Sequence, residues 1–389
     1  LLTTPESLSL LLSYPDNARM FAGLKTIVID EVHAFASGKR GDLLALAMAR
    51  LQAIVPGLRR VALSATIGDP EDYRRWLAPE EIPAVVNPAE GILWTANQRL
   101  VGGDALAKLG DGGYDEGARG GQIRDSLRAL VASGRKAAPA DLLAVQLDDR
   151  AVYLGRWQQL LLEVLTDEAV DRKDARGELR AAVRQWNGRA SVDSAAYRLV
   201  RGFRQEVARQ VLSPFFERAQ ADFPRFSYNK FHYEDAVWRL VHEKPARLLN
   251  SAHQSWDHLL LAAADAVIAD ADEAGLPLAR MTWGANNTLR MPHAFSRFLP
   301  GVLARRLDMP PDPLPGDNDM PRVQSPTNGA SQRLVVSPGH EAEGIFHQPG
   351  GQSGHPLSPF YRAGHAAWVK GEPTPLLPGP AQHTLVLRP

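Results

Sequence analysis

The sequence has 389 residues, of which 44% are hydrophobic, and its 44 basic and 44 acidic side chains give no net charge. This length is enough for two or three domains with a sizeable core, and the balanced charge excludes a global basic field for nucleic acid or anionic membranes, although a local patch is still allowed. The absence of cysteine excludes disulfides, thiolate metal sites and a cysteine nucleophile, and is compatible with any compartment. Apolar runs such as residues 43–49 and 259–264 are far shorter than the roughly 18 residues of a membrane span, so we expect no membrane partner. The chain begins LLTTPESL, without methionine or a secretory signal, and we expect it to start within a longer protein.

The first 78 residues alternate helices with short apolar strands. Residues 7–13 (SLSLLLS) and 41–55 (GDLLALAMARLQAIV) have helical patterns. Residues 24–30 (LKTIVID) form a continuous apolar run, which predicts a buried strand covered on both faces, and residues 59–66 (RRVALSAT) predict a second strand. Strand, helix and strand in this order predict one crossover unit of a doubly wound parallel sheet.

The pattern changes after about residue 80. Between about residues 120 and 275 the chain is a succession of predicted helices rich in Ala, Leu and Arg, including residues 121–131, 177–186, 196–212 and 258–275. Because acids are mixed with the bases at 184–209, we interpret the arginines there as surface side chains.

The last part of the chain, from about residue 281, is rich in Gly, Pro, Asn and His. Residues 332–339 and 343–351 are short strand-like pieces, and GDND at 316–319 is interpreted as a turn. The histidines of this part lack the three-to-five spacing common in zinc sites, so we interpret them as loop residues; they are His340, His347, His355 and His365.

An acidic pair follows the first predicted strand, in the motif DEVH at 30–33. At the carboxyl edge of a parallel sheet Asp30 could hold magnesium and Glu31 could orient or deprotonate an attacking water. The alternative is that the two acids only cap a turn. The pair is accompanied by TTPESL at 3–8 and SAT at 64–66, and in this order the three motifs resemble the superfamily 2 helicases, most closely their large-helicase-related branch. The resemblance covers about 75 residues.

This resemblance implies a fragment of a RecA-like parallel-sheet lobe and assigns roles to nine residues. Contact with nucleic acid is implied for Thr4, Pro5 and Glu6, ATP and magnesium binding for Asp30, Glu31 and His33, and coupling to strand movement for Ser64, Ala65 and Thr66.

The glycine loop that cradles phosphates in such motors is missing from this sequence. It should end in Gly-Lys and then Ser or Thr, and it should precede the acidic pair. Gly38-Lys39 is followed by Arg40 and comes after that pair. We therefore expect the remnant to bind ATP and magnesium poorly and to have no ATPase activity.

A second set of motifs begins with NPAEGILWTANQRLVGG at 87–103. By itself, Asn97 could be only a turn residue that bonds local backbone. Together with five later segments, however, it resembles the penicillin acylase family over about residues 80–389; those segments are 110–127, 184–189, 283–293, 316–336 and 349–361.

The second resemblance implies an N-terminal-nucleophile amide hydrolase of the layered αββα type with a large helical portion, acting on a small acylated amide. In such enzymes the amino group of a terminal serine activates its own hydroxyl, and an amide side chain binds the oxyanion. The implied oxyanion residue is Asn97, and Arg119 is implied to help orient it. The serine, the small chain and most calcium ligands of the family would precede the matched part, so we claim no metal and expect no activity from this chain alone.

The leading hypothesis is therefore a chimera. Residues 1–79 would be a partial helicase ATP-binding domain and residues 80–389 the carboxy-terminal part of an acylase, with the joint somewhere in 78–86. One alternative is a nucleic-acid-dependent ATPase that needs a partner to supply the phosphate loop, and another is a noncatalytic binding protein. A periplasmic location is expected of many acylases and a cytoplasmic one of the helicase, so the compartment stays open.

Overall fold

The computed structural model describes residues 4–30, 39–63, 82–109, 114–224, 232–381 and 384–386. The motifs at Glu31 and His33 and at Ser64, Ala65 and Thr66 lie outside these residues. The chain divides into two compact units, which we describe separately: the first comprises Leu1–Gly91 and Asn97–Asp115, and the second comprises Ile92–Ala96 and Glu116–Pro389.

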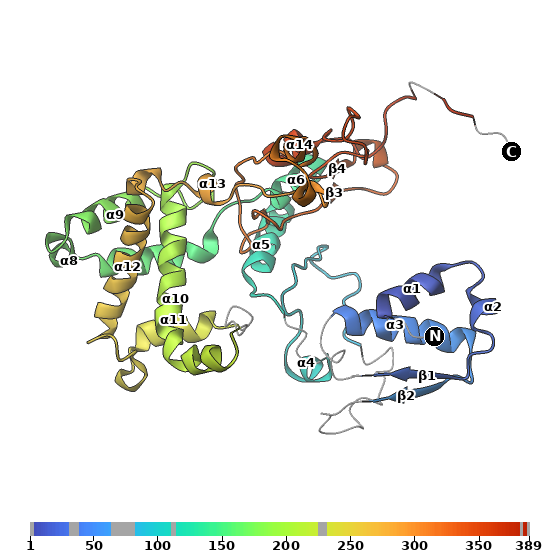
Figure 1. Cartoon of the computed structure of the whole chain (residues 1–389), viewed down its shortest axis with the longest axis horizontal. Helices are drawn as coiled ribbons and strands as arrows, with labels where there is room; N and C mark the ends of the chain where they lie inside the picture. Colours follow the sequence, from blue (N-terminus) through green and yellow to red (C-terminus); the bar gives the residue numbers. More distant parts are fainter. Residues whose placement is uncertain are drawn as a thin grey trace. The chain divides into compact units, whose positions relative to one another are not determined.

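The first unit contains a parallel pair of strands joined through a helix, which confirms the predicted crossover. Strand β1 pairs in parallel with β2, with Thr26 opposite Arg59 and Ile29 opposite Ala62. Helices α1 and α3 lie on one side of the two strands (Figure 1). The elements of this unit are α1 (Pro5–Ser13), α2 (Asn17–Phe21), β1 (Thr26–Ile29), α3 (Lys39–Ile54), β2 (Arg59–Ala62) and α4 (Gly103–Leu109).

The prediction that β1 is covered on both faces is wrong for the described residues. Ile27 and Ile29 pack against the cluster of buried side chains on α1 and α3, whereas Val28 between them is 55% exposed. Alternate side chains of a strand point to opposite faces. The continuous apolar run therefore places apolar side chains on both faces of β1, one packed against the helices and the other exposed.

The second unit is mostly helical. Its elements are α5 (Ala118–Ala132), α6 (Pro139–Gln146), η4 (Val152–Leu154), α7 (Gly155–Val164), α8 (Asp167–Asp171), α9 (Asp174–Arg184), α10 (Ala195–Asp222), α11 (Glu234–Glu243), η6 (Ala246–Leu248), α12 (Trp256–Glu273), η7 (Leu278–Arg280), α13 (Trp283–Asn286), η8 (Ser296–Phe298), α14 (Gly301–Leu307), β3 (Arg333–Val335), η9 (Glu341–Glu343), β4 (Ile345–His347) and α15 (His365–Lys370). The long predicted helices and both strand-like pieces are confirmed.

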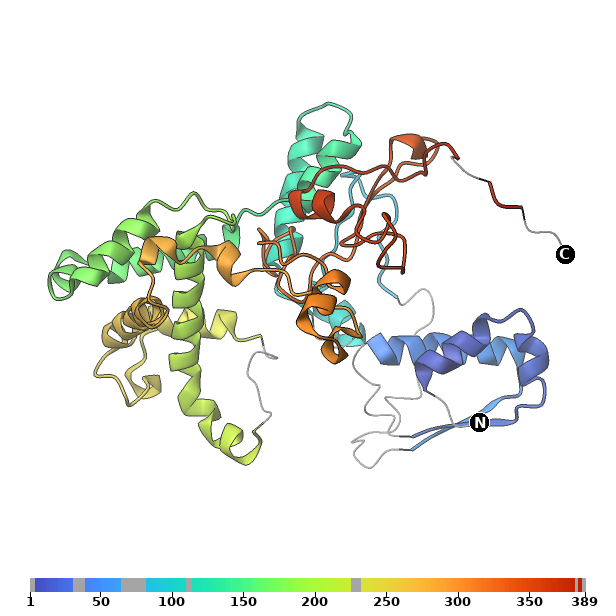
Figure 2. The ribbon, with the colours of Figure 1, turned by 45° about the horizontal axis from the view of Figure 1, so that its top comes forward.

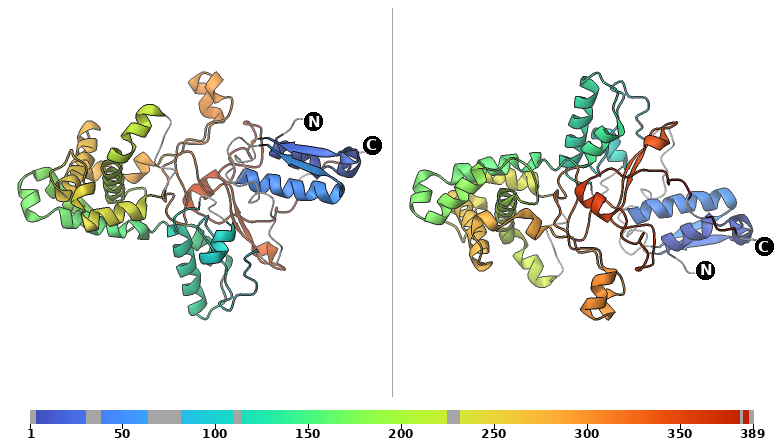
Figure 3. Two further views of the ribbon diagram at one scale, coloured as in Figure 1. Left: turned by 90° about the horizontal axis from the view of Figure 1, so that it is seen from below. Right: turned by 90° about the horizontal axis from the view of Figure 1, so that it is seen from above.

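The core of the second unit is a bundle in which α10 and α12 pack against each other and against α7 and α9, and these helices stay grouped in every view (Figures 1, 2 and 3). Leu259, Ala263 and Val267 recur every four residues along one face of α12 and are buried. Trp157 of α7 meets Phe203 of α10 edge to face, with ring centroids 6.3 Å apart. Apolar periodicity therefore builds the bundle.

Outside the bundle, regular structure is sparse. Strands β3 and β4 form an antiparallel pair, with Leu334 opposite Phe346. The described chain is thus mostly helical with two small sheets, and the layered αββα arrangement stays a prediction. In the part of the chain that the structure describes, no helix is both long and apolar enough to cross a membrane.

Candidate functional site

Asn97 occupies a left-handed turn in the first unit. Its φ is 66°, a conformation that Asn adopts more readily than most other non-glycine residues. The backbone carbonyl of Asn97 accepts a hydrogen bond of 2.8 Å from the amide of Asp115, and Gln98 forms a parallel bridge with the same residue. This local pairing ties the turn to the segment before α5 and leaves Asn97 exposed.

Arg119 lies in the first turn of α5 and is half-buried. It belongs to the second unit, whereas Asn97 belongs to the first. Each is described within its own unit, and the expectation that the two serve one oxyanion site stays a prediction.

The residues implied to contact nucleic acid form the start of α1. The hydroxyl of Thr4 caps the helix by accepting a hydrogen bond of 3.3 Å from the amide of Ser7, and Pro5 occupies the first helical position. Glu6 forms a 2.6 Å ion pair with Arg40, whose hydrogen bond lowers the pKa of Glu6 to about 2. These contacts give the motif a structural role, while its contact with nucleic acid is untested.

Asp30 directly follows β1, at the carboxyl end of the strand, where the sequence predicts it. The other members of the second and third helicase motifs lie outside the described residues, so the structure does not test their grouping.

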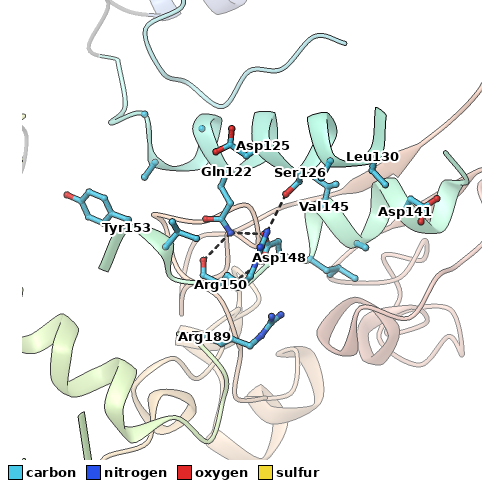
Figure 4. A pocket seen from close by; sticks show the side chains of 17 residues that line it. Gln122, Asp125, Ser126, Leu130, Asp141, Val145, Asp148, Arg150, Tyr153 and Arg189 are labelled. Atoms are coloured by element: carbon cyan, nitrogen blue, oxygen red, sulfur yellow. Dashed lines mark hydrogen bonds and ion pairs between the residues drawn. The ribbon is translucent and has the colours of Figure 1, made fainter. Parts of the chain in front are cut away.

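A pocket of about 950 Å³ runs along α5 and α6 in the second unit (Figure 4). Its walls combine apolar side chains such as Leu130, Val145 and Val152 with polar ones from α5 and from the segment after α6. Pockets of this size and mixed lining are typical of sites for small molecules.

The polar wall of this pocket is a connected network. The side-chain amide of Gln122 donates to Asp148 (2.7 Å) and to the carbonyl of Arg150 (3.1 Å). The guanidinium of Arg150 donates to Asp148 at 2.6 Å and to the hydroxyl of Ser126 at 3.4 Å (Figure 4). Burial by itself raises the pKa of Asp148, but the hydrogen bonds from Arg150 and Gln122 hold it below its usual range. Asp148 is therefore ionised at neutral pH and held in place by these hydrogen bonds.

Sequence reasoning missed this network. The segment containing Gln122 predicts only a helix, and its partner Asp148 is 26 residues away in the sequence. The sole local signal is the run of charges DDR at 148–150.

Two of the four histidines interpreted as loop residues are buried instead. His347 lies in β4 and is 1% exposed, and its ring bonds the carbonyl of Glu372. His365 begins α15 and bonds the carbonyl of Pro349 at 2.6 Å. The loop interpretation is wrong for both, because His347 belongs to β4 and His365 to α15, and each side chain is buried there. Within the described ranges, no three His, Asp or Glu side chains are grouped to hold a metal ion.

These observations define a mostly helical protein with a polar pocket and a separate asparagine-bearing turn. Comparison with protein families then assigns it: the chain belongs to the penicillin amidase family, whose profile matches residues 18–384. By its name this is a hydrolase family. The match begins well before the predicted joint, whose position stays a prediction.

Individual relatives show two kinds of similarity. The penicillin acylase 2 proenzyme of Pseudomonas sp. (strain SE83) is 27% identical over 322 residues, which are 79% of this chain and 39% of that protein. The Lhr helicase/uracil glycosylase of Escherichia coli (strain K12) is 44% identical over 90 residues, 23% of this chain and 6% of that protein. The ATP-dependent helicase Lhr-Core of Methanothermobacter thermautotrophicus is 40% identical over 77 residues, 20% of this chain and 9% of that protein. The chain therefore spans well under half the length of each of these relatives.

Proposed function

We propose that residues 80–389 are the carboxy-terminal part of an amide hydrolase that cleaves linear amide C–N bonds of small acylated substrates, with Asn97 as a donor to the oxyanion. The observation that carries this proposal is the penicillin amidase match over most of the chain. The exposure of Asn97 supports it, because its side-chain amide is accessible to a substrate.

The chemistry assigned to Asn97 is hydrogen bonding to developing negative charge. When a nucleophile attacks an amide carbonyl, its oxygen gains charge, and an amide side chain donates to that oxygen without carrying charge itself. The backbone bond from Asp115 fixes the turn in advance, which suits a donor that must be preorganised. The nucleophile and its amine base, which belong to one terminal serine, are proposed to come from the front of the large chain, with an acylase small chain completing the enzyme.

The test is a completed enzyme, made by joining residues 80–389 to the small chain and the front of the large chain of a penicillin acylase relative. Asn97→Ala should lower its turnover of a chromogenic amide by about 10²- to 10³-fold, since one oxyanion donor is lost. The matched control is Asn87→Ala: Asn87 is also exposed and also left-handed, with φ 49°, but the proposal gives it no role. Equal turnover of the two variants would remove Asn97 from the site.

A second candidate is a nucleic-acid-dependent ATPase, which the three Lhr-like motifs in the first 75 or so residues favour. The absence of a Gly-Lys-Ser/Thr loop from the 389 residues argues against it, because the backbone amides of that loop hold the phosphates. The ATP affinity of the chain separates the two candidates.

A further inference from the structure

Arg333 of β3 is a buried cation that the proposed hydrolase does not use. Its side chain is 1% exposed, although an arginine keeps its charge at neutral pH. In the antiparallel pair it lies opposite His347 of β4, and its guanidinium carbon lies 5.2 Å from the centre of the Trp368 ring. Strand pairing and ring packing therefore hold the guanidinium inside the second unit.

One end of this guanidinium has its hydrogen bonds satisfied. Nη1 donates to the carbonyl of Trp368 at 2.9 Å and to Nδ1 of His347 at 3.4 Å. Because a guanidinium can only donate, Nδ1 of His347 accepts, and the ring proton is on Nε2, which donates to the carbonyl of Glu372. The indole nitrogen of Trp368 donates to the carbonyl of Ala330 at 2.9 Å, which holds the ring in place.

The other edge of the Arg333 guanidinium has no partner. Nε and Nη2 are both buried, and neither has a hydrogen-bond acceptor among the described residues. In a planar guanidinium the N–H groups of these two atoms are parallel, and they form an edge that binds both oxygens of a carboxylate. The described part of the chain thus presents a bidentate donor without supplying its acceptor.

A second buried arginine adds positive charge beside this edge. Arg322 is 9% exposed, and its Nη2 donates at 2.8 Å to the carbonyl of Val369, the residue after Trp368. Nε of Arg322 donates at 2.6 Å to the side-chain oxygen of Gln324. The side-chain nitrogen of Gln324 is also buried and has no acceptor within the described ranges.

The chain offers these two arginines no carboxylate of their own in its described part. The acid that acts on Arg322 is Asp149, whose carboxylate already pairs with Arg189 at 2.5 Å. Burial accordingly lowers the pKa of both Arg322 and Arg333.

We propose that the Nε–Nη2 edge of Arg333 binds one small carboxylate, which supplies the counter-ion that this buried guanidinium lacks. A buried cation without a counter-ion is destabilising, and a bidentate carboxylate offsets the desolvation with two charge-assisted hydrogen bonds. Because the edge is buried, the ligand must be short. The site does not rest on the proposed hydrolase, since Asn97 belongs to the other unit.

The test is urea unfolding of the full chain, followed by circular dichroism, in sodium formate or sodium gluconate at equal ionic strength. Both anions are carboxylates, but a buried edge admits formate and excludes the much larger gluconate. We expect a dissociation constant on the order of 10 mM, at which about 100 mM formate should raise the folding equilibrium constant about tenfold over gluconate.

Three variants locate the effect. Arg333→Met removes the charge and the donors, and its stability should be the same in formate and gluconate. Arg333→Lys keeps the charge but not the planar pair of donors, so it should lose the difference as well. Arg280→Met, at an exposed arginine of η7, is the matched control and should keep the tenfold difference.

Two outcomes would overturn the proposal: equal stability of the unaltered chain in the two salts, or a formate effect that persists in Arg333→Met. A measurement without variants covers the case in which the Arg333 variants do not fold. In saturation-transfer NMR the proton of formate should receive magnetisation from the unaltered chain, and the absence of transfer would refute the site.

Discussion

Replacing Glu234 by Gln is the sharpest test of what holds the helical bundle together. Glu234 is 3% exposed at the start of α11 and accepts hydrogen bonds from Arg156, Trp157 and Arg204, two of which carry charge. The Gln variant keeps the shape and one acceptor oxygen but leaves the guanidinium groups of Arg156 and Arg204, whose side chains are 32% and 12% exposed, without their counter-ion. Breaking a buried ion pair by removing one partner typically costs about 3–5 kcal/mol, and we expect a loss of this size in the free energy of unfolding.

The control lies on the same helix. Glu243 also pairs with an arginine, Arg239, at 2.7 Å, but both side chains are more than half exposed. Such surface pairs contribute little, so Glu243→Gln should leave the unfolding midpoint nearly unchanged. Urea unfolding followed by circular dichroism measures both variants. If the two variants unfold at the same urea concentration, the bundle does not depend on the buried pair.

The pH dependence gives an independent check of the same reasoning. Burial raises the pKa of Glu234, but Arg204 and the hydrogen bonds from Arg156 and Trp157 outweigh burial and hold the pKa below its usual 4.5. A lowered pKa stabilises the fold above the unfolded value, and that stabilisation is lost as the pH falls through the folded value. The difference between the unaltered chain and Glu234→Gln should therefore be constant near neutral pH and shrink below about pH 4.5.

Two further predictions concern the 316–320 loop and the helicase remnant. Gly316→Ala should lower the free energy of unfolding by about 2–5 kcal/mol, because φ is +85° and the new Cβ would lie 2.1 Å from the carbonyl oxygen of Arg322. Gly275→Ala should lower it by only about 1–2 kcal/mol, because φ is +65° there but no atom lies within 4 Å of the new Cβ. Thermal unfolding distinguishes the two variants. The chain should bind magnesium-ATP no more tightly than millimolar, since it has no phosphate loop, and a micromolar dissociation constant by calorimetry would favour the ATPase alternative.

The sequence predicts those elements that local pattern determines. The helices of the bundle and the parallel pair β1–β2 follow from apolar periodicity and from the strand–helix–strand order. The turn at Asn97 is likewise predictable from its residue type.

Partnerships across the chain could not be predicted in this way. The arginines of the segment 184–209 have the pattern of a solvated face, yet Arg204 is 12% exposed and Arg201 27% exposed, and the partners of these two arginines lie 30 and 116 residues further on. Likewise GDND at 316–319 has the composition of a turn, but it places Asp317 in a buried ion pair. A local pattern contains no information about which distant charged residue will lie nearby. The surface interpretation is therefore wrong for Arg201 and Arg204, whereas Arg184 and Arg209 are exposed as predicted.

The second unit stabilises its buried arginines in two ways, by pairing them with carboxylates or by bonding them to backbone carbonyls. Burial lowers the pKa of Arg204, but Glu234 outweighs burial and raises it well above its usual value. Arg333 is 1% exposed and has no carboxylate within ion-pair distance among the described residues. Its guanidinium donates a hydrogen bond to the carbonyl of Trp368, and that of Arg322 donates to the carbonyl of Val369. Both carbonyls lie near the end of α15.

Carbonyl groups at a helix end carry only partial negative charge. They therefore offset the burial of a cation incompletely, and burial lowers the pKa of Arg333 to about 10, with Arg322 adding to the effect. The ion pairs of Glu234 thus make the bundle depend on pH in acid, whereas Arg333 does not titrate near neutrality. The bundle should accordingly lose stability in acid as Glu234 is protonated, while Arg333 keeps its charge.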